Sequence, residues 1–213
     1  MSQSADILNS LRNKGGEMAK EMIEIRWHGR GGQGAKTAAQ LVARVALEEG
    51  SYSQGFPEYG PERMGAPIRG FTRVSDAAIR LHCAIERPDV VVVLDDTLIG
   101  LPEVTEGVDP STIFVINTTL TPRAMSEKLG RPEGGAPGGK VHCVDATKIS
   151  IDELGRPMPN TPMVGALVKV TGCISIDALK KDVERKFLAK FGERVVRGNI
   201  RAIGRAYEEV QSS

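Results

Sequence analysis

The chain of 213 residues has few aromatic side chains, almost no net charge and no long apolar run. Aromatic residues make up 4% of it, and 28 Lys and Arg stand against 27 Asp and Glu, a net charge of +1. Nucleic-acid binding needs a basic surface and often stacking aromatic side chains, so this composition argues against it. A membrane helix or a secretory signal needs an apolar run that is absent here. We therefore expect a soluble, cytoplasmic protein without a nucleic-acid or membrane partner.

Cysteine is also scarce. The three cysteines are an odd number and lie far apart, at Cys83, Cys143 and Cys173. No two of them form the C-x-x-C pair that zinc sites and iron–sulfur ligand sets usually contain. The sequence therefore predicts a reduced chain that binds no metal and no cluster itself.

Glycine, in contrast, is abundant, with 24 residues gathered in loops. The first cluster lies between a predicted strand at 23–27 and a predicted helix at 35–49, and it satisfies G-x-G-x-x-G with Gly29, Arg30, Gly31, Gly32, Gln33 and Gly34. Such a loop can bring backbone N–H groups close to an anion at the helix N-terminus. The same glycines can instead make only a tight turn between strand and helix. Both interpretations stay open on the motif alone.

Two common nucleotide signatures fail at this loop. A P-loop requires Lys directly after its last glycine, but Ala35 stands there and Lys36 comes one residue late, a rotation of about 100° on a helix. A dinucleotide fingerprint requires an acidic residue about 20 positions on, where this chain has Gln54. An independent dehydrogenase or P-loop enzyme is therefore disfavoured.

Apolar runs at 89–96, 111–119 and 141–147 are typical of buried strands in a parallel sheet. Further strands are expected at 52–54, at 68–74 and, as an extension, at 78–82. Helices are expected at 122–129, 162–173, 176–191 and 195–210. The pattern predicts an α/β, Rossmann-like fold with a mostly parallel sheet flanked by helices and a helical C-terminus. We expect residues 1–21 to be a polar extension and residues 22–213 to form a single domain.

Four stretches of the chain carry a family resemblance. They are "GRGGQG", "YSQGFPEYGPERMGAPIRGFTRVSD", "VVVVLDDTL" and "PNTPMVGAL", in this order and spanning about residues 23–210. Together they resemble the gamma subunit, or gamma domain, of the 2-oxoacid:ferredoxin oxidoreductase family. Members of that family oxidise pyruvate, ketoisovalerate, phenylglyoxylate or related 2-oxoacids, and the substrate of this chain is left open.

The resemblance implies a multisubunit enzyme that decarboxylates a 2-oxoacid oxidatively, forms an acyl-coenzyme A and passes electrons to ferredoxin or, through a flavin subunit, to NAD. Thiamine diphosphate, Mg²⁺ and [4Fe-4S] clusters are expected on partner chains, namely the thiamine-binding alpha and beta subunits and a ferredoxin-like delta subunit. This chain would then have no catalytic residue, no metal and no activity alone. Its candidate ligand is coenzyme A, with the backbone of the glycine loop and Arg30 holding phosphate oxygens.

A second group of residues is predicted to line an interface or the coenzyme A cavity: Glu58, Tyr59, Glu62, Arg63, Arg69, Asn160 and Met163. The alternative is a purely structural scaffold, in which Tyr59 and Arg63 only anchor an interface. Asn160 is expected to cap the helix that follows it, and Asp95 and Asp96 to cap a helix or turn. His28, His82 and His142 are interpreted as structural.

Overall fold

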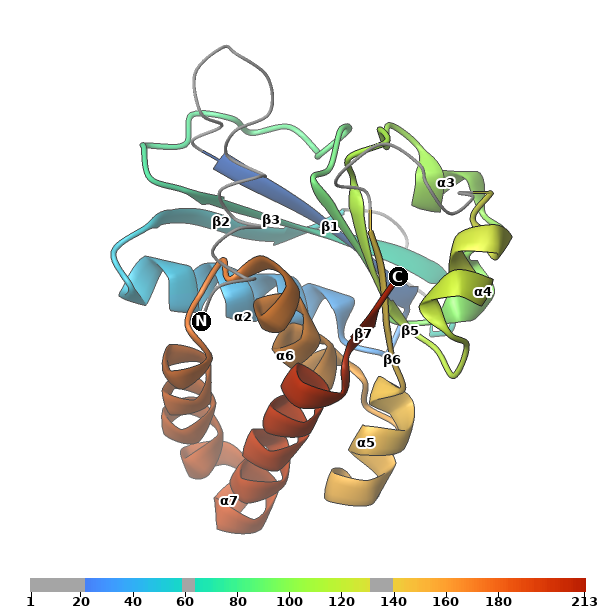
Figure 1. The fold of residues 1–213 in the computed structure, drawn as a ribbon. Coiled ribbons are helices and arrows are strands. Elements are labelled where there is room, and N and C mark those ends of the chain that lie inside the picture. Colours follow the sequence, from blue (N-terminus) through green and yellow to red (C-terminus); the bar gives the residue numbers. More distant parts are fainter. Residues whose placement is uncertain (1–21, 59–63, 131–139) are drawn as a thin grey trace.

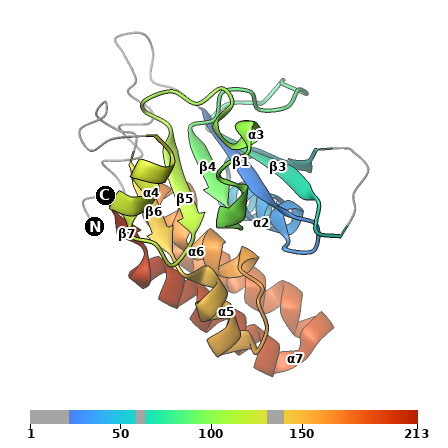
Figure 2. The same ribbon diagram turned by 90° about the vertical axis from the view of Figure 1, so that its right-hand side faces the viewer.

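The computed structural model describes residues 22–58, 64–130 and 140–213. Within these residues one seven-stranded sheet runs in the order β2-β3-β1-β4-β5-β6-β7, with helices on both faces (Figures 1 and 2). The predicted extension at residues 1–21 lies outside the described residues.

Four parallel strands form the centre of the sheet. They are β1 (Met22–Arg30), β4 (Val90–Val93), β5 (Ile113–Asn117) and β6 (Val141–Val144). Every residue of β4, β5 and β6 is buried, because helices cover both faces. The predicted parallel core is confirmed.

Antiparallel strands extend this core on both sides: β2 (Tyr52–Pro57), β3 (Pro67–Ser75) and β7 (Gln211–Ser212). β3 lies between β1 and β2, so the strand that follows the first helix is not the direct neighbour of β1. The predicted extension at 78–82 is wrong. Ser75 pairs with Met22 and Tyr52, the first residues of β1 and β2, so the chain beyond it has no strand to pair with.

The helices form two layers (Figure 1). Below the sheet in that view lie α2 (Ala35–Glu48), α5 (Ala146–Leu154), α6 (Asn160–Thr171) and α7 (Ile176–Glu209). The opposite face carries the short helices η1 (Asp96–Leu98), α3 (Pro102–Thr105) and α4 (Pro122–Lys128). No helix in these described ranges is long and apolar enough to cross a membrane.

The two expected C-terminal helices are both present within α7. The Ser175 hydroxyl accepts a hydrogen bond from the N–H of Ala178 at its start, and Gly192, with φ 76° and ψ 168°, breaks it into two segments. A side chain at such a positive φ would be strained, so glycine allows the chain to bend there. The first half of α7 therefore runs away from the sheet, and the second half returns to it (Figure 1).

The larger hydrophobic core lies between the sheet and the layer of α2, α6 and α7. Trp27 is fully buried there, and its indole N–H donates to the Thr72 hydroxyl at 3.0 Å. That hydroxyl donates in turn to the backbone oxygen of Ala39 in α2 at 2.9 Å. This chain of hydrogen bonds fixes α2, and with it the glycine loop, against β1 and β3.

Candidate functional site

The glycine loop connects β1 to α2 and is held by its own backbone. The N–H of Gly31 donates to the oxygen of Ala66 at 2.8 Å, and the N–H of Gln33 donates to the oxygen of Arg30 at 2.9 Å. Gly32 and Gly34 have φ angles of 98° and 84°, which explains glycine at both positions. Their own N–H groups bond to none of the described residues, and no side chain caps α2. With respect to the described residues, the loop therefore presents two unbonded N–H donors at a helix N-terminus.

Arg30 and Gln33 do not point toward those donors. The Arg30 guanidinium donates to Asp95 at 3.2 Å and to the Thr97 hydroxyl at 2.8 Å. The Gln33 amide donates to the same Asp95 carboxylate at 2.7 Å. Burial alone would raise the pKa of Asp95, but the hydrogen bonds from Thr97 and Gln33 and the charge of Arg30 lower it on balance. Asp95 also caps η1 by accepting from the N–H of Thr97, as predicted.

A cavity of about 610 Å³ opens beside the loop, beneath α2 and against α6 and α7. Gly31, Gly32 and Gly34 line it, together with Lys36 and Thr37 from the first turn of α2. Further lining comes from the segment between α5 and α6 and from both sides of the bend in α7. Of the six predicted loop residues, three of the four glycines therefore line the cavity, whereas Gly29, Arg30 and Gln33 do not.

The walls of this cavity are cationic. Lys36, Arg44, Arg156, Lys186 and Lys190 line it, and none of the described residues adds a carboxylate to the lining. Arg44 is neutralised by the buried Asp182, but the other four side chains make no hydrogen bond or ion pair to a described residue. Phe187 and Phe191 stand beside the lysines, with ring centroids 5.5 Å apart. The cavity can therefore hold an anionic ligand that also has an apolar or aromatic part.

Asn160 lies at the end of the cavity that adjoins the loop. It is only 7% exposed, and a Cβ built on Gly34 would stand 2.6 Å from its amide nitrogen. Its carboxamide bonds to no described residue, and Oδ1 is buried without a partner. The expectation that Asn160 caps α6 is wrong, because Pro159 occupies the cap position and no side chain caps this helix. A buried, unpaired carboxamide is costly unless a ligand completes it.

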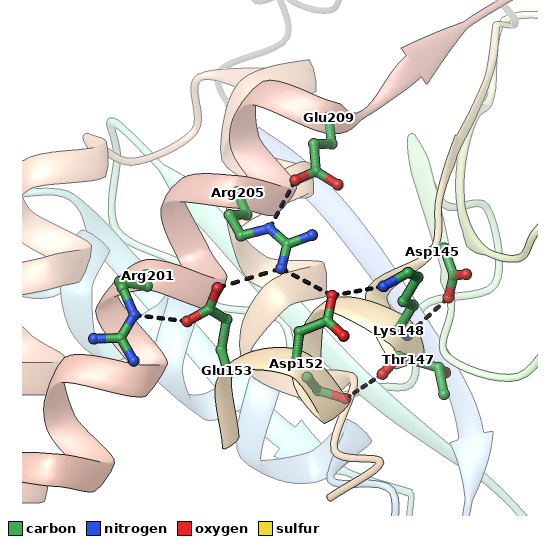
Figure 3. Close-up of polar contacts among 9 residues, drawn as sticks. Asp145, Thr147, Lys148, Asp152, Glu153, Arg201, Arg205 and Glu209 are labelled. Atoms are coloured by element: carbon green, nitrogen blue, oxygen red, sulfur yellow. Dashed lines mark hydrogen bonds and ion pairs between the residues drawn. The ribbon is translucent and has the colours of Figure 1, made fainter. Parts of the chain in front are cut away.

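Ion pairs between α5 and the second half of α7 hold the segment that leads to Asn160 (Figure 3). Arg205 contacts Asp152 at 3.1 Å and Glu153 at 3.2 Å, and Arg201 contacts Glu153 at 2.6 Å. Lys148 joins the network through Asp152 at 2.7 Å. These contacts fix the C-terminal end of α5, after which the chain enters the cavity wall.

The remaining predicted residues lie elsewhere. Glu58 and Arg69 form a two-pronged ion pair at 2.5 and 2.7 Å and line a separate cavity of about 150 Å³ near His28. Met163 is fully buried in the core rather than in a cavity or at a surface. Tyr59, Glu62 and Arg63 lie outside the described residues.

Within the described part of the chain, the buried His28 and Cys143 and the partly buried Cys173 show no catalytic arrangement. His28 accepts a hydrogen bond from Arg26 at 3.0 Å, and burial together with the charges of Arg26 and Arg69 lowers its pKa to about 3. Burial raises the pKa of Cys143 to about 12 and that of Cys173 to about 11, so both thiols stay protonated. Among the described residues no group of three His, Cys, Asp or Glu side chains could hold a metal ion.

Sequence reasoning missed most of the cavity wall. Arg156, Lys186, Lys190 and the two phenylalanines lie more than 100 residues from the glycine loop and follow no motif. Helix α5 was also missed, although Asp145 is a good N-cap and accepts from the N–H of Lys148. Gln54, where a dinucleotide site needs an acid, donates to the Leu81 oxygen and accepts from Arg73, which leaves no ribose contact there.

Comparison with known proteins identifies the family. Residues 24–209 match the family described as pyruvate ferredoxin/flavodoxin oxidoreductase. The pyruvate synthase subunit PorC of Thermotoga maritima is 48% identical over 196 residues, covering 92% of this chain and 98% of that protein. The common gamma subunit of the pyruvate/ketoisovalerate oxidoreductases of Pyrococcus furiosus is 42% identical over 190 residues, covering 89% and 98%.

Solved structures of related proteins have the same fold. The crystal structure of the Thermotoga maritima subunit PORC has a TM-score of 0.79 at 46% identity and covers 91% of this chain and 99% of that one. A 2-oxoglutarate:ferredoxin oxidoreductase from Magnetococcus marinus shares the fold, with a TM-score of 0.69 at 21% identity, over 89% of this chain and 31% of that one. The chain therefore belongs to the pyruvate ferredoxin/flavodoxin oxidoreductase family, in which it is a gamma subunit of a 2-oxoacid oxidoreductase complex.

Proposed function

We propose that this gamma subunit binds the phosphates of coenzyme A for a complex that oxidises a 2-oxoacid to an acyl-coenzyme A. The observation that carries the proposal is the cationic cavity beside the glycine loop, where Lys36, Arg156, Lys186 and Lys190 have no partner among the described residues. Coenzyme A brings a diphosphate and a 3′-phosphate, and clustered cations with free N–H groups are what such groups require.

Within this proposal the diphosphate lies at the N-terminus of α2. The N–H groups of Gly32 and Gly34 and the ammonium of Lys36 are available to it there. Arg30 is not assigned to the phosphates, because Asp95 and Thr97 already hold its guanidinium. Lys36, one residue too late for a P-loop, is instead the side chain that lines the cavity with the glycines.

The reactive chemistry belongs to the partners that the resemblance implies. Thiamine diphosphate supplies the carbanion chemistry for decarboxylation, with Mg²⁺ and iron–sulfur clusters, and we place all of them on the alpha, beta and delta subunits. The role of this chain is to hold the coenzyme A so that its thiol meets the acyl group on the partner chains. On this proposal the chain has no activity alone, and the complex reduces ferredoxin or a flavin-linked NAD acceptor.

The test is the kinetics of the purified complex with pyruvate, coenzyme A and a redox-dye acceptor. Lys36→Gln removes one charge-assisted contact, which contributes about 1.5–3 kcal/mol, so the KM for coenzyme A should rise about tenfold or more at nearly unchanged kcat. Lys181→Gln is the matched control, because Lys181 is exposed on α7 and does not line the cavity. A substitution of Gly32 or Gly34 is a poor probe, because both have positive φ.

The competing proposal is a purely structural scaffold. It predicts that Lys36→Gln and Lys181→Gln complexes assemble normally and have the same KM for coenzyme A as the wild type. That result would remove the coenzyme A contact and leave only the assembly role of this chain.

A further inference from the structure

We infer that the carboxamide of Asn160 pairs with a secondary amide of the pantetheine arm and so sets the direction in which coenzyme A lies in the cavity. The inference rests on the proposed function and goes further, because it assigns each end of the ligand to one wall of the cavity.

Phosphate would satisfy only half of the Asn160 carboxamide. Phosphate oxygens only accept hydrogen bonds, so they could accept from Nδ2 but would leave the buried Oδ1 without a donor. A secondary amide offers one N–H donor and one C=O acceptor, which matches the donor and the acceptor of an unpaired carboxamide. The pantetheine arm contains two such amides, whereas the nucleotide phosphates contain none.

The position of Asn160 agrees with the order of groups in the ligand. Its amide nitrogen lies directly against Gly34, the residue that precedes α2. The pantetheine arm follows the diphosphate directly, so a diphosphate at the α2 N-terminus brings the arm to Asn160. Asn160 and the loop glycines Gly31, Gly32 and Gly34 line the same cavity, so a ligand that reaches the loop also reaches Asn160.

The opposite end of the ligand fits the bend of α7. Lys186 and Lys190 stand there without partners among the described residues, next to Phe187 and Phe191. Phe191 is 53% exposed, so its ring is open to a base. Lysine ammonium groups suit the 3′-phosphate, and a phenylalanine ring can stack on the adenine. The adenosine end therefore lies at the α7 bend and the amide end at Asn160.

The experiment uses the intact complex and two fragments of the ligand. Adenosine 3′,5′-bisphosphate, the nucleotide end, is measured as a competitive inhibitor against coenzyme A, and pantetheine is measured as the acyl acceptor. Asn160→Leu should raise the KM for coenzyme A about five- to tenfold and raise that for pantetheine similarly. The same variant should leave the inhibition constant of the bisphosphate unchanged. Asn160→Ala, which removes the carboxamide without adding bulk, should repeat this pattern.

The matched variant is the double substitution Lys186→Gln and Lys190→Gln. It should weaken the bisphosphate about tenfold and leave pantetheine unchanged. If the Asn160 variants weaken the bisphosphate as much as they weaken coenzyme A, the inferred direction is overturned. If neither set of variants changes any of these constants while Lys36→Gln still raises the KM for coenzyme A, the inferred direction is wrong but the proposed function stands. If Lys36→Gln also has no effect, the proposed function fails with it.

Discussion

The closest packing between helices offers the sharpest test of the fold around the site. Gly165 in α6 lies against α7, and a Cβ built on it would stand 2.4 Å from the backbone oxygen of Ile203. Real Cβ atoms do not approach an oxygen so closely, and neither side can yield by rotating a side chain, because the contact joins backbone to backbone. Gly165→Ala must therefore push α6 and the second half of α7 apart.

The expected change in the free energy of unfolding of Gly165→Ala is the difference between two opposing effects. Replacing glycine by alanine inside a helix stabilises it by about 1 kcal/mol. Overpacking a rigid core contact costs about 1–3 kcal/mol, and the short distance here favours the upper end. We expect Gly165→Ala to lower the free energy of unfolding by about 2 kcal/mol.

Gly204 in α7 is the matched control. It also lies inside a helix, but the nearest atom to an added Cβ is the flexible Lys180 Nζ at 3.9 Å. Gly204→Ala should therefore stabilise the chain by about 0.5–1 kcal/mol. Urea unfolding of both variants, followed by circular dichroism, measures the two changes. Equal stability of Gly165→Ala and Gly204→Ala would refute the reasoning, because the helix propensity term is common to both.

Two further predictions concern buried ionisable side chains. His28 and His142 are buried, and burial first of all lowers their pKa values to about 3 and about 4, so the unfolded chain, with pKa values near 6.5, binds more protons below pH 7. The two histidines therefore do not reduce the free energy of unfolding above pH 7, but they lower it by about 3 kcal/mol between pH 7.5 and pH 5.5. Urea unfolding at these two pH values measures the change, and equal free energies at both would contradict the prediction. Asp182 has a fully buried side chain and accepts hydrogen bonds from Arg44 at 2.5 and 3.0 Å. Asp182→Ala should cost about 2 kcal/mol in the same assay, less than the about 3–5 kcal/mol of a fully buried pair, because Arg44 is partly exposed. A loss below 0.5 kcal/mol would show that Arg44 is rehydrated at little cost.

Local patterns predicted the parts of this protein that depend on neighbours in sequence. The buried run Val90–Val93 is a central strand because its side chains are apolar on both faces. Ser175 begins α7 because its hydroxyl can reach an N–H three residues on. Ala35 and Gln54 excluded two nucleotide signatures, and the glycines at 32 and 34 do adopt the positive φ angles that such a loop requires.

Strand order, in contrast, could not be read from the sequence. The pattern of Pro67–Ser75 predicts a strand but not that it inserts between β1 and β2, because that choice depends on pairing between distant segments. The same holds for β7, whose two residues pair with β6 only after α7 has returned the chain to the sheet. Both pairings are decided by contacts that local periodicity does not contain.

The sequence by itself thus determined the fold class, the strand–loop–helix unit and, through four ordered motifs, the family. The tertiary structure decided what the loop faces. It turned Arg30 to Asp95, placed Lys36 and Asn160 on the cavity, and brought Lys186 and Lys190 from the far end of the chain to the same space. The physical reason is that a binding site is a set of side chains converging on one volume, and convergence depends on packing between elements that are far apart in sequence.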